Sequence, residues 1–277
     1  MKFDNVMAMT QPYLYILLVI LLTVSWFVLC VLYLKSKKQF SLKQDQAKDE
    51  IEVQSQQLTV LQSELEANQL LDPLTQVFNR NYFHNNINSV IAEAETIHAM
   101  DPDADKTLMF MLVNLADFEE KCKQYGQAVA DKMLAEFGQV IKNALSNKDM
   151  VIHWRDAVFL VVCKAVSHTN MPFIAERIRS TLAGHDFATQ TSHQSKLNFS
   201  IGISPHLLHS EDQNQTDHHF TLAIADAALH LAKQSQSNMW NILTVNGPNV
   251  DLNKLYSTEN INNQPDLSIQ SSNNTID

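Results

Sequence analysis

An uncharged, apolar run of 22 residues extends from Tyr13 to Leu34. At a rise of about 1.5 Å per residue, a helix of this length crosses a hydrocarbon layer of about 30 Å. The alternative is a cleaved signal peptide, but the apolar core of such a peptide is shorter and ends at a small-residue cleavage site. We therefore predict a transmembrane helix over residues 13–34, with residues 1–12 as a short periplasmic N-terminus.

The basic residues are distributed unequally around this run. Only Lys2 precedes it, whereas a group of lysines follows it, namely Lys35, Lys37, Lys38, Lys43 and Lys48. Lysines that flank a membrane helix are enriched on its cytoplasmic side. The C-terminal part of the chain is thus predicted to be cytoplasmic, and the short N-terminus is too small for an external sensor domain.

Residues 35–70 form a polar segment that is rich in Gln and Glu and contains neither Gly nor Pro. An apolar residue recurs every seven positions, at Ile51, Leu58 and Leu65. This spacing is typical of a coiled-coil seam, but Gln54 and Asn68 interrupt it. We predict a helical stalk that forms a marginal coiled coil and makes the protein a homodimer. A solvated linker helix is the alternative.

The charge and the cysteine content exclude several classes of protein. A net charge of -10 and a pI near 5.5 argue against nucleic acid as a partner, because binding to phosphates requires clustered Lys and Arg. Three widely spaced cysteines without a CxxC pair indicate neither a disulfide framework nor a zinc site, and favour a reducing compartment.

The histidines are densest in one part of the sequence, at His206, His209, His218 and His219. Adjacent histidines on a helix point to different faces, and no HExxH motif or cysteine accompanies them. We therefore interpret the group as a solvated surface cluster and not as a metal site.

Beyond residue 70 the apolar pattern alternates between the periods of a strand and of a helix. Strands are expected at residues 107–115, 150–154, 157–162, 196–204 and 239–243, and helices at 129–141, 172–183 and 220–233. In the helix at 172–183, Phe173 and Ile178 are expected on the buried face. The alternation, with one antiparallel hairpin, predicts an α+β domain over residues 71–245 whose mixed central sheet is flanked by helices. Residues 246–277 are rich in Asn, Ser, Gln and Asp and are predicted to be a disordered tail.

The segment DPLTQVFNRNYF at residues 72–83 resembles the opening motif DxLTxLxNRxxF of the GGDEF domain of diguanylate cyclases, which join two GTP molecules into cyclic di-GMP. The matching residues are Asp72, Leu74, Thr75, Asn79, Arg80 and Phe83. Further similarity lies at Phe118, Tyr125-Gly126, Asp131, FSIGIS at 199–204 and ADAALHLAK at 225–233. The resemblance implies a nucleotidyl cyclase-like fold and a single-pass protein of a bacterial inner membrane.

In this resemblance, Arg155-Asp156-Ala157-Val158-Phe159 occupies the place of the signature Gly-Gly-Asp-Glu-Phe. The family's glycines let the turn approach GTP, and its two acidic residues supply carboxylates for magnesium and for activating the attacking ribose hydroxyl. Only Phe159 matches, and neither Ala157 nor Val158 can bind a cation. Because no Gly-Gly pair occurs in the chain, the signature is absent and not displaced.

Other family positions are also replaced. The metal-binding aspartate corresponds to Asn114, whose neutral amide is a poor magnesium ligand. The guanine-contacting asparagine corresponds to Cys122, and the arginine of the inhibitory RxxD motif to Ser146. Two contacts match: Asp131 for guanine and Lys233 for the triphosphate.

These replacements predict a protein without catalytic residues, metal or other cofactor, which acts by binding itself and an unknown protein partner in cyclic di-GMP-linked signalling. One alternative is a sensor that binds GTP or cyclic di-GMP weakly through Asp131 and Lys233 without turnover, and another is a residual cyclase. The matching residues Asp72, Asn79 and Arg80 are expected to cap and pair at the entrance of the domain.

Overall fold

The structure is a computed structural model of the chain. It describes residues 20–22, 25–39, 44, 48–49, 51–61, 70–101, 105–188, 194–208, 213–235, 238–256 and 263–272. The chain divides into two compact units, Met1–Glu66 and Ala67–Asp277, which are considered separately.

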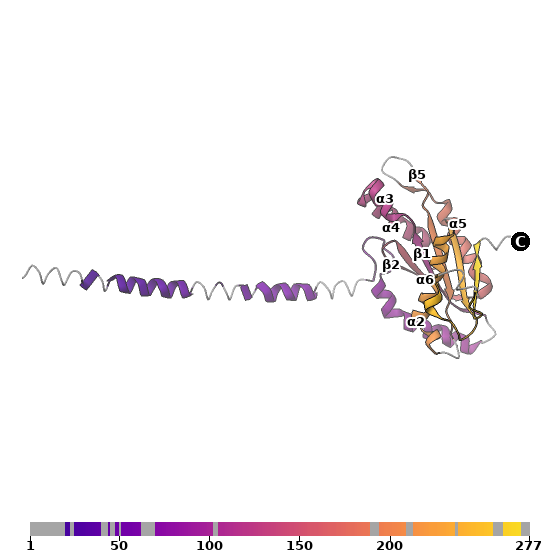
Figure 1. The fold of residues 1–277 in the computed structure, drawn as a ribbon, viewed down its shortest axis with the longest axis horizontal. Coiled ribbons are helices and arrows are strands. Elements are labelled where there is room, and N and C mark those ends of the chain that lie inside the picture. Colours follow the sequence, from indigo (N-terminus) through magenta and orange to yellow (C-terminus); the bar gives the residue numbers. More distant parts are fainter. Residues whose placement is uncertain are drawn as a thin grey trace, which may run out of the picture. The chain divides into compact units, whose positions relative to one another are not determined.

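The described part of the first unit is helical (Figure 1). Ile20–Gln39 is a helix of 20 residues with a mean hydropathy of 1.6, which by length and composition could cross a membrane. Of the predicted span 13–34, residues 13–19 lie outside the described residues, as do residues 1–12. Residues 51–61 are also helical and expose Ile51 and Leu58, whereas Leu65, the third residue of the heptad repeat, lies outside the described residues.

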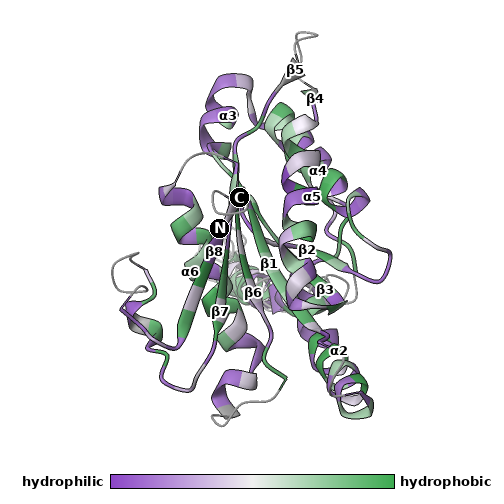
Figure 2. Ribbon diagram, turned by 90° about the vertical axis from the view of Figure 1, so that its right-hand side faces the viewer, coloured by the Kyte–Doolittle hydropathy of each residue, from purple (hydrophilic) through white to green (hydrophobic). Residues whose placement is uncertain are grey.

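The second unit is built on a six-stranded sheet with the strand order β2-β3-β1-β6-β7-β8 (Figure 2). Its strands are β1 (Thr107–Leu115), β2 (Met150–Arg155), β3 (Val158–Val166), β6 (Phe199–Pro205), β7 (Met239–Val245) and β8 (Leu267–Ser271). Two short strands, β4 (Phe187–Ala188) and β5 (Gln194–Ser195), form a separate pair. Neighbouring strands of the large sheet are antiparallel except β6 and β7, which are parallel. The predicted α+β class with a mixed sheet is confirmed.

Helices cover both faces of this sheet. They are α2 (Arg80–Met100), α3 (Phe118–Tyr125), α4 (Gln127–Asn143), α5 (Met171–Gly184) and α6 (His218–Gln234). Residues of α4 and α5 share an apolar cluster with one face of the sheet, and residues of α2 and α6 share a cluster with the other face.

The central strand β1 shows why both faces must be covered. Phe110 and Leu112 belong to the cluster with α2 and α6, whereas Met109 and Met111 belong to the cluster with α4 and α5. Successive side chains of a strand point to opposite faces. Because β1 is apolar at nearly every position, it can be buried only between two layers of helices.

Helix α6 lies very close to β6 at Gly202. A Cβ atom there would collide with the backbone nitrogen of Leu229 and the carbonyl oxygen of Ala225. Glycine at this position therefore lets helix and strand pack with their backbones in contact. The close packing places the C-terminal end of α6, with Lys233, beside the end of β1.

The expectation of disorder from residue 246 onward is wrong for part of this segment. Strand β8 pairs antiparallel with β7, with Leu267 opposite Val245. Leu255 and Leu267 are buried in an apolar cluster with α6. The segment has few apolar residues, but the edge of β7 offers unpaired backbone groups, so a strand with little apolar surface of its own can still be held.

The buried face of α5 also differs from the expectation. Phe173 is 73% exposed, whereas Met171, Ala175 and Ile178 are buried. These three residues recur at helical spacing, and the helix begins at Met171, one residue before the predicted start. Met171 thus takes the core position that was expected for Phe173.

Candidate nucleotide cleft

Strands β2 and β3 form the predicted hairpin, with Val151 opposite Val161. Its turn contains Asp156 and Ala157, one residue later than the expected Arg155-Asp156 turn. Asp156 has a φ of 45°, in the left-handed region that Asp tolerates better than most residues with a side chain. The turn therefore closes without glycine.

Three polar contacts hold the hairpin tip. The His153 ring lies between Asp72 and the turn, with Nδ1 3.1 Å from Asp72 Oδ2 and Nε2 2.8 Å from the carbonyl oxygen of Asp156. Arg155 Nη2 donates to Asp226 Oδ1 of α6 at 2.6 Å. The roles of His153 and Asp226 were not anticipated from the sequence, because contacts between residues so far apart along the chain have no local pattern.

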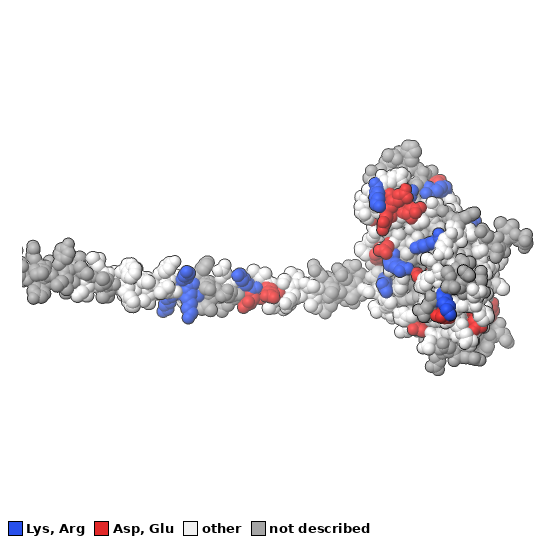
Figure 3. Space-filling view, viewed as in Figure 1, with Lys and Arg blue, Asp and Glu red and all other residues white. Residues whose placement is uncertain are grey.

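A cleft of about 640 Å³ lies between the hairpin, the end of β1 and α3. Its lining includes Asn114, Ala157, Val158 and Lys233. A smaller hollow of about 340 Å³ shares Asn114 and Lys233 with it. Figure 3 shows acidic and basic side chains close together on the part of the second unit that carries α3. The cleft is thus polar and of mixed charge.

The strand ends at the cleft carry no carboxylate. Asn114 pairs with Val158 on one side and Ser200 on the other, and only an amide is available from its side chain. Ala157 and Val158 are 6% and 5% exposed and belong to the two apolar clusters. The carboxylates that line the cleft come instead from the turn, at Asp156, and from α3 and the residue before it.

Lys233 and Asp131, the two expected nucleotide contacts, are placed differently. Lys233 lines both hollows, and burial together with the nearby charge of Arg155 lowers the pKa of its ammonium group, against the opposite effect of Asp226. Asp131 lies on α4, accepts a hydrogen bond from Gln127 Nε2 at 2.7 Å, and does not line the cleft. The structure thus brings Lys233 to Asn114 and the hairpin, whereas Asp131 is not part of the lining of this cleft.

The residues of the opening motif hold the entrance to the domain. Asp72 Oδ1 accepts hydrogen bonds from the backbone nitrogen and the hydroxyl of Thr75, at 2.8 and 2.7 Å. Asn79 is the N-cap of α2 and accepts from the Tyr82 nitrogen at 2.8 Å. Asp72 thus pairs, and Asn79 caps, at this entrance. Burial opposes ionisation of Asp72, but hydrogen bonds from Thr75 and His153 outweigh it and hold the pKa of the carboxyl below its ordinary value.

The other residues of the motif continue this arrangement. The Arg80 guanidinium lies over the Trp154 ring, 4.5 Å from its centroid. Phe83 is fully buried, and Leu74 is 40% exposed. Phe159 is fully buried and packs against Phe137, with ring centroids 5.8 Å apart. Apart from Leu74, these side chains pack against other residues of the domain.

The expectation of a solvated histidine cluster is wrong for His206, which is 2% exposed. Its Nδ1 is 2.7 Å from the Thr221 hydroxyl, and its Nε2 has no hydrogen-bond partner among the described residues. His218 and His219 lie at the start of α6, and His209 lies outside the described residues. The burial of His206 could not be predicted, because nothing in the local sequence separates a histidine that is buried between a helix and a sheet from one on the surface.

A mixed sheet covered by helices on both faces, with a hairpin beside a polar cleft, defines an α+β domain of the nucleotidyl cyclase-like type. Residues 69–239 match the family model described as diguanylate cyclase, GGDEF domain. Because this match covers more than half of the 277 residues, the chain belongs to the GGDEF family.

A curated relative and two solved structures illustrate the similarity. The diguanylate cyclase DgcS of Shewanella oneidensis is 23% identical over 141 residues, which cover 51% of this chain and 44% of that protein. The coiled coil and GGDEF domain of DgcB from Caulobacter crescentus, solved with c-di-GMP, is 18% identical, with 72% of this chain and 97% of that chain covered and a TM-score of 0.53. Diguanylate cyclase SiaD from Pseudomonas aeruginosa, solved with its activator SiaC, is 19% identical, with 85% and 87% covered and a TM-score of 0.51. At these identities the two structures show the fold alone.

Proposed function

We propose that this chain is a membrane-anchored GGDEF protein without cyclase activity, which acts as a signalling or scaffolding component linked to cyclic di-GMP by binding other proteins. One observation carries the proposal: Asn114, Ala157 and Val158 lie together at the cleft, at the positions where the resemblance places the carboxylates of a cyclase. None of the three offers an anionic ligand.

At the positions that the resemblance assigns to magnesium ligands, the donor set does not fit this ion, and the carboxylates that do line the cleft come from the hairpin turn and from around α3. Magnesium is bound in proteins mainly through carboxylates, water and substrate phosphates. Among the described residues, the one group of three metal-capable side chains within 4.8 Å of one another is Asp217, His218 and His219, which do not line the cleft. Phosphoryl transfer depends on positioning and on electrostatic stabilisation by metal ions, so this cleft is poorly equipped for turnover.

Anchoring and self-association complete the proposal. The helix Ile20–Gln39 and the lysines after it support a single-pass protein of a bacterial inner membrane with a cytoplasmic domain. The exposed Ile51 and Leu58 support dimerisation through the stalk, because tethering to a bilayer raises the effective concentration of two helices. The structure of SiaD with its activator SiaC makes a protein partner reasonable for this fold.

A nucleotide sensor is the second candidate function. Lys233 and Arg155 both line the cleft and could meet a phosphate group. Against this, Arg155 is already paired with Asp226, and Asp131 lies away from the lining. Binding of GTP or cyclic di-GMP would therefore rest mainly on Lys233 and be weak.

The test of activity uses the full chain in detergent micelles, incubated with GTP and Mg²⁺ or Mn²⁺, with an active diguanylate cyclase in parallel. We expect no cyclic di-GMP by mass spectrometry. Product that is lost in the double variant Asp131→Ala, Lys233→Ala would overturn the inactive assignment. Calorimetric titration with each nucleotide separates the two candidates: saturable binding that is lost in Lys233→Ala favours the sensor, and its absence favours protein binding.

Topology and dimerisation have separate tests. A reporter fused after Asp277 should behave as cytoplasmic, and activity of a periplasm-dependent reporter there would contradict the topology. In membranes and in a background without the native cysteines, Leu58→Cys should crosslink more strongly than Gln56→Cys. Equal crosslinking would contradict the dimeric stalk.

A further inference from the structure

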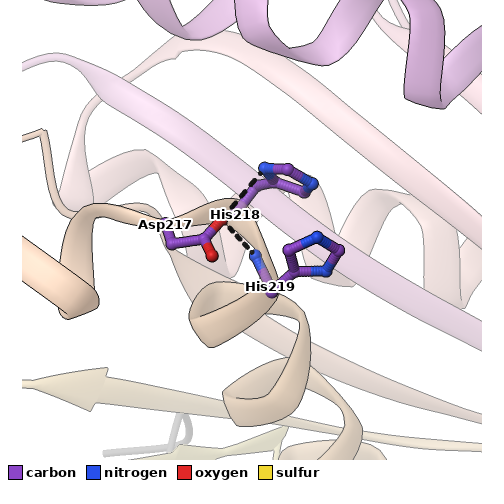
Figure 4. Close-up of side chains that lie close together, drawn as sticks. All are labelled: Asp217, His218 and His219. Carbon is purple, nitrogen blue, oxygen red and sulfur yellow. Dashed lines mark hydrogen bonds and ion pairs between the residues drawn. The ribbon is translucent and has the colours of Figure 1, made fainter.

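The N-terminal turn of α6 gathers one carboxylate and two imidazoles. Asp217 is the N-cap of the helix, and its Oδ1 accepts a hydrogen bond from the backbone nitrogen of His219 at 3.1 Å. The same oxygen lies 3.1 Å from Nδ1 of His218. Figure 4 shows the carboxylate between the His218 ring and the backbone of His219. Although the histidines are adjacent in sequence, their ring centroids are only 4.1 Å apart.

This geometry is close to that of a metal site. One ligand atom from each of Asp217, His218 and His219 can be chosen so that all lie within 4.8 Å of one another. Ligand atoms of a tetrahedral zinc site lie about 3.4 Å apart, as follows from metal–nitrogen distances of about 2.1 Å. A bound ion would have to draw these atoms closer together.

The surroundings hold the group in place and keep it accessible. The His218 side chain is 13% exposed and packs edge-on against Phe83 of α2, at a centroid distance of 5.9 Å. Asp217 is 48% exposed, so an ion can reach it from solvent. The cluster thus has one ligand fixed by the core and others open to the surface.

Two further histidines, His84 and His206, do not belong to the cluster. His84 of α2 already accepts a hydrogen bond from Arg80 Nε at its Nε2, at 3.2 Å. His206 Nδ1 lies 2.7 Å from the Thr221 hydroxyl of α6, and its buried Nε2 has no hydrogen-bond partner among the described residues.

We propose that Asp217, His218 and His219 form a site for a first-row transition-metal ion of the zinc class, with the fourth coordination position open to water. Imidazole and carboxylate ligands suit zinc, cobalt, nickel and copper, and not magnesium. The bound ion would lie at the first turn of α6, outside the lining of the nucleotide cleft. The site is thus independent of whether the domain turns over GTP.

The test uses the full chain without a histidine tag, in detergent micelles. Titration with Co²⁺ should saturate at one equivalent with visible d–d absorption, and Zn²⁺ should displace the cobalt. His219→Gln and Asp217→Asn should each weaken binding by at least about tenfold, or about 1.4 kcal/mol. Asparagine keeps the helix N-cap, so Asp217→Asn separates the loss of a ligand from the loss of the helix.

His230→Gln is the matched control, because it removes a histidine from the same helix outside the cluster. Its cobalt affinity should equal that of the wild type. Zinc should also raise the thermal midpoint of the wild type and of this control, but not of His219→Gln. Absence of saturable binding, or equal binding by His219→Gln and His230→Gln, would overturn the proposal.

Discussion

The entrance of the domain and the nucleotide cleft both correspond to GGDEF sequence motifs, but they use their side chains differently. At the entrance, Asp72 pairs with Thr75 and His153, and Asn79 caps α2. At the cleft, Ala157 and Val158 are packed into the apolar clusters and offer no polar atom to a ligand. The motif residues at the entrance thus take part in pairing and capping, whereas Ala157 and Val158 at the cleft contribute apolar packing alone.

The largest expected effect of a substitution is at the entrance. Phe83→Ala removes a fully buried ring that contacts Phe110 and Trp154, with centroid distances of 6.4 and 5.2 Å. The free energy of unfolding should fall by about 3–5 kcal/mol. Urea denaturation measures it, with the exposed Phe173→Ala as control, for which we expect a change below about 0.5 kcal/mol. Equal effects at the two positions would contradict the burial described here.

A second effect is pH-dependent and arises at His206, beside the start of β1. Burial lowers the pKa of His206 from 6.5 to about 4. The unfolded chain therefore binds a proton that the folded chain does not, so stability falls as the pH drops from 6.5 toward 4. The loss from this group is about 3 kcal/mol. Urea denaturation at several pH values should show a smaller loss for His206→Asn, and an unchanged slope in that variant would contradict the assignment.

Asp72→Ala should lower the free energy of unfolding by an intermediate amount, because Asp72 is a paired polar residue. It removes hydrogen bonds to a charged acceptor and should lower stability by about 1.5–3 kcal/mol at pH 7. The pKa of Asp72 is lowered in the folded state, so its contribution is present above the unfolded value of 3.8 and is lost as the pH falls through the folded one. The difference between wild type and variant should therefore disappear in acid, and a difference that persists there would exclude the charged form as its source.

The smallest effect is expected at the tip of the hairpin. Arg155→Ala breaks the ion pair with Asp226, in which the side chains are 51% and 31% exposed. Exposed pairs contribute about 0–1 kcal/mol, so the hairpin should keep its stability and the fold its melting temperature within a few degrees. A loss comparable to that of Asp72→Ala would show that the cleft, like the entrance, is required for folding.

Much of the fold could be predicted from local sequence. The limits of β1 agree with the expected 107–115, because nine consecutive residues with high apolar content read as a strand buried on both faces. The capping by Asn79 could be predicted because a cap depends on residues within one turn. Strand β8 could not, since its stability comes from the edge of β7 and not from its own composition.

The candidate site shows the same division. Residue types at Asn114, Ala157 and Val158 are visible in the sequence, and with them the lack of carboxylates at these positions. Arg155 meets Asp226 because α6 packs close to the hairpin. His153 meets Asp72 because the entrance of the domain also packs close to it. The burial of His206 likewise depends on how α6 packs on β6.

The amino-acid sequence alone is sufficient for the apolar N-terminal helix, for the five strands and three helices that it predicts, and for the lack of a carboxylate at Asn114, Ala157 and Val158, because these depend on side-chain chemistry and short-range periodicity. Tertiary packing alone decides which polar side chains meet. Arg155 meets Asp226, and His153 meets Asp72, through contacts between elements that are distant in the chain, which no local spacing rule contains.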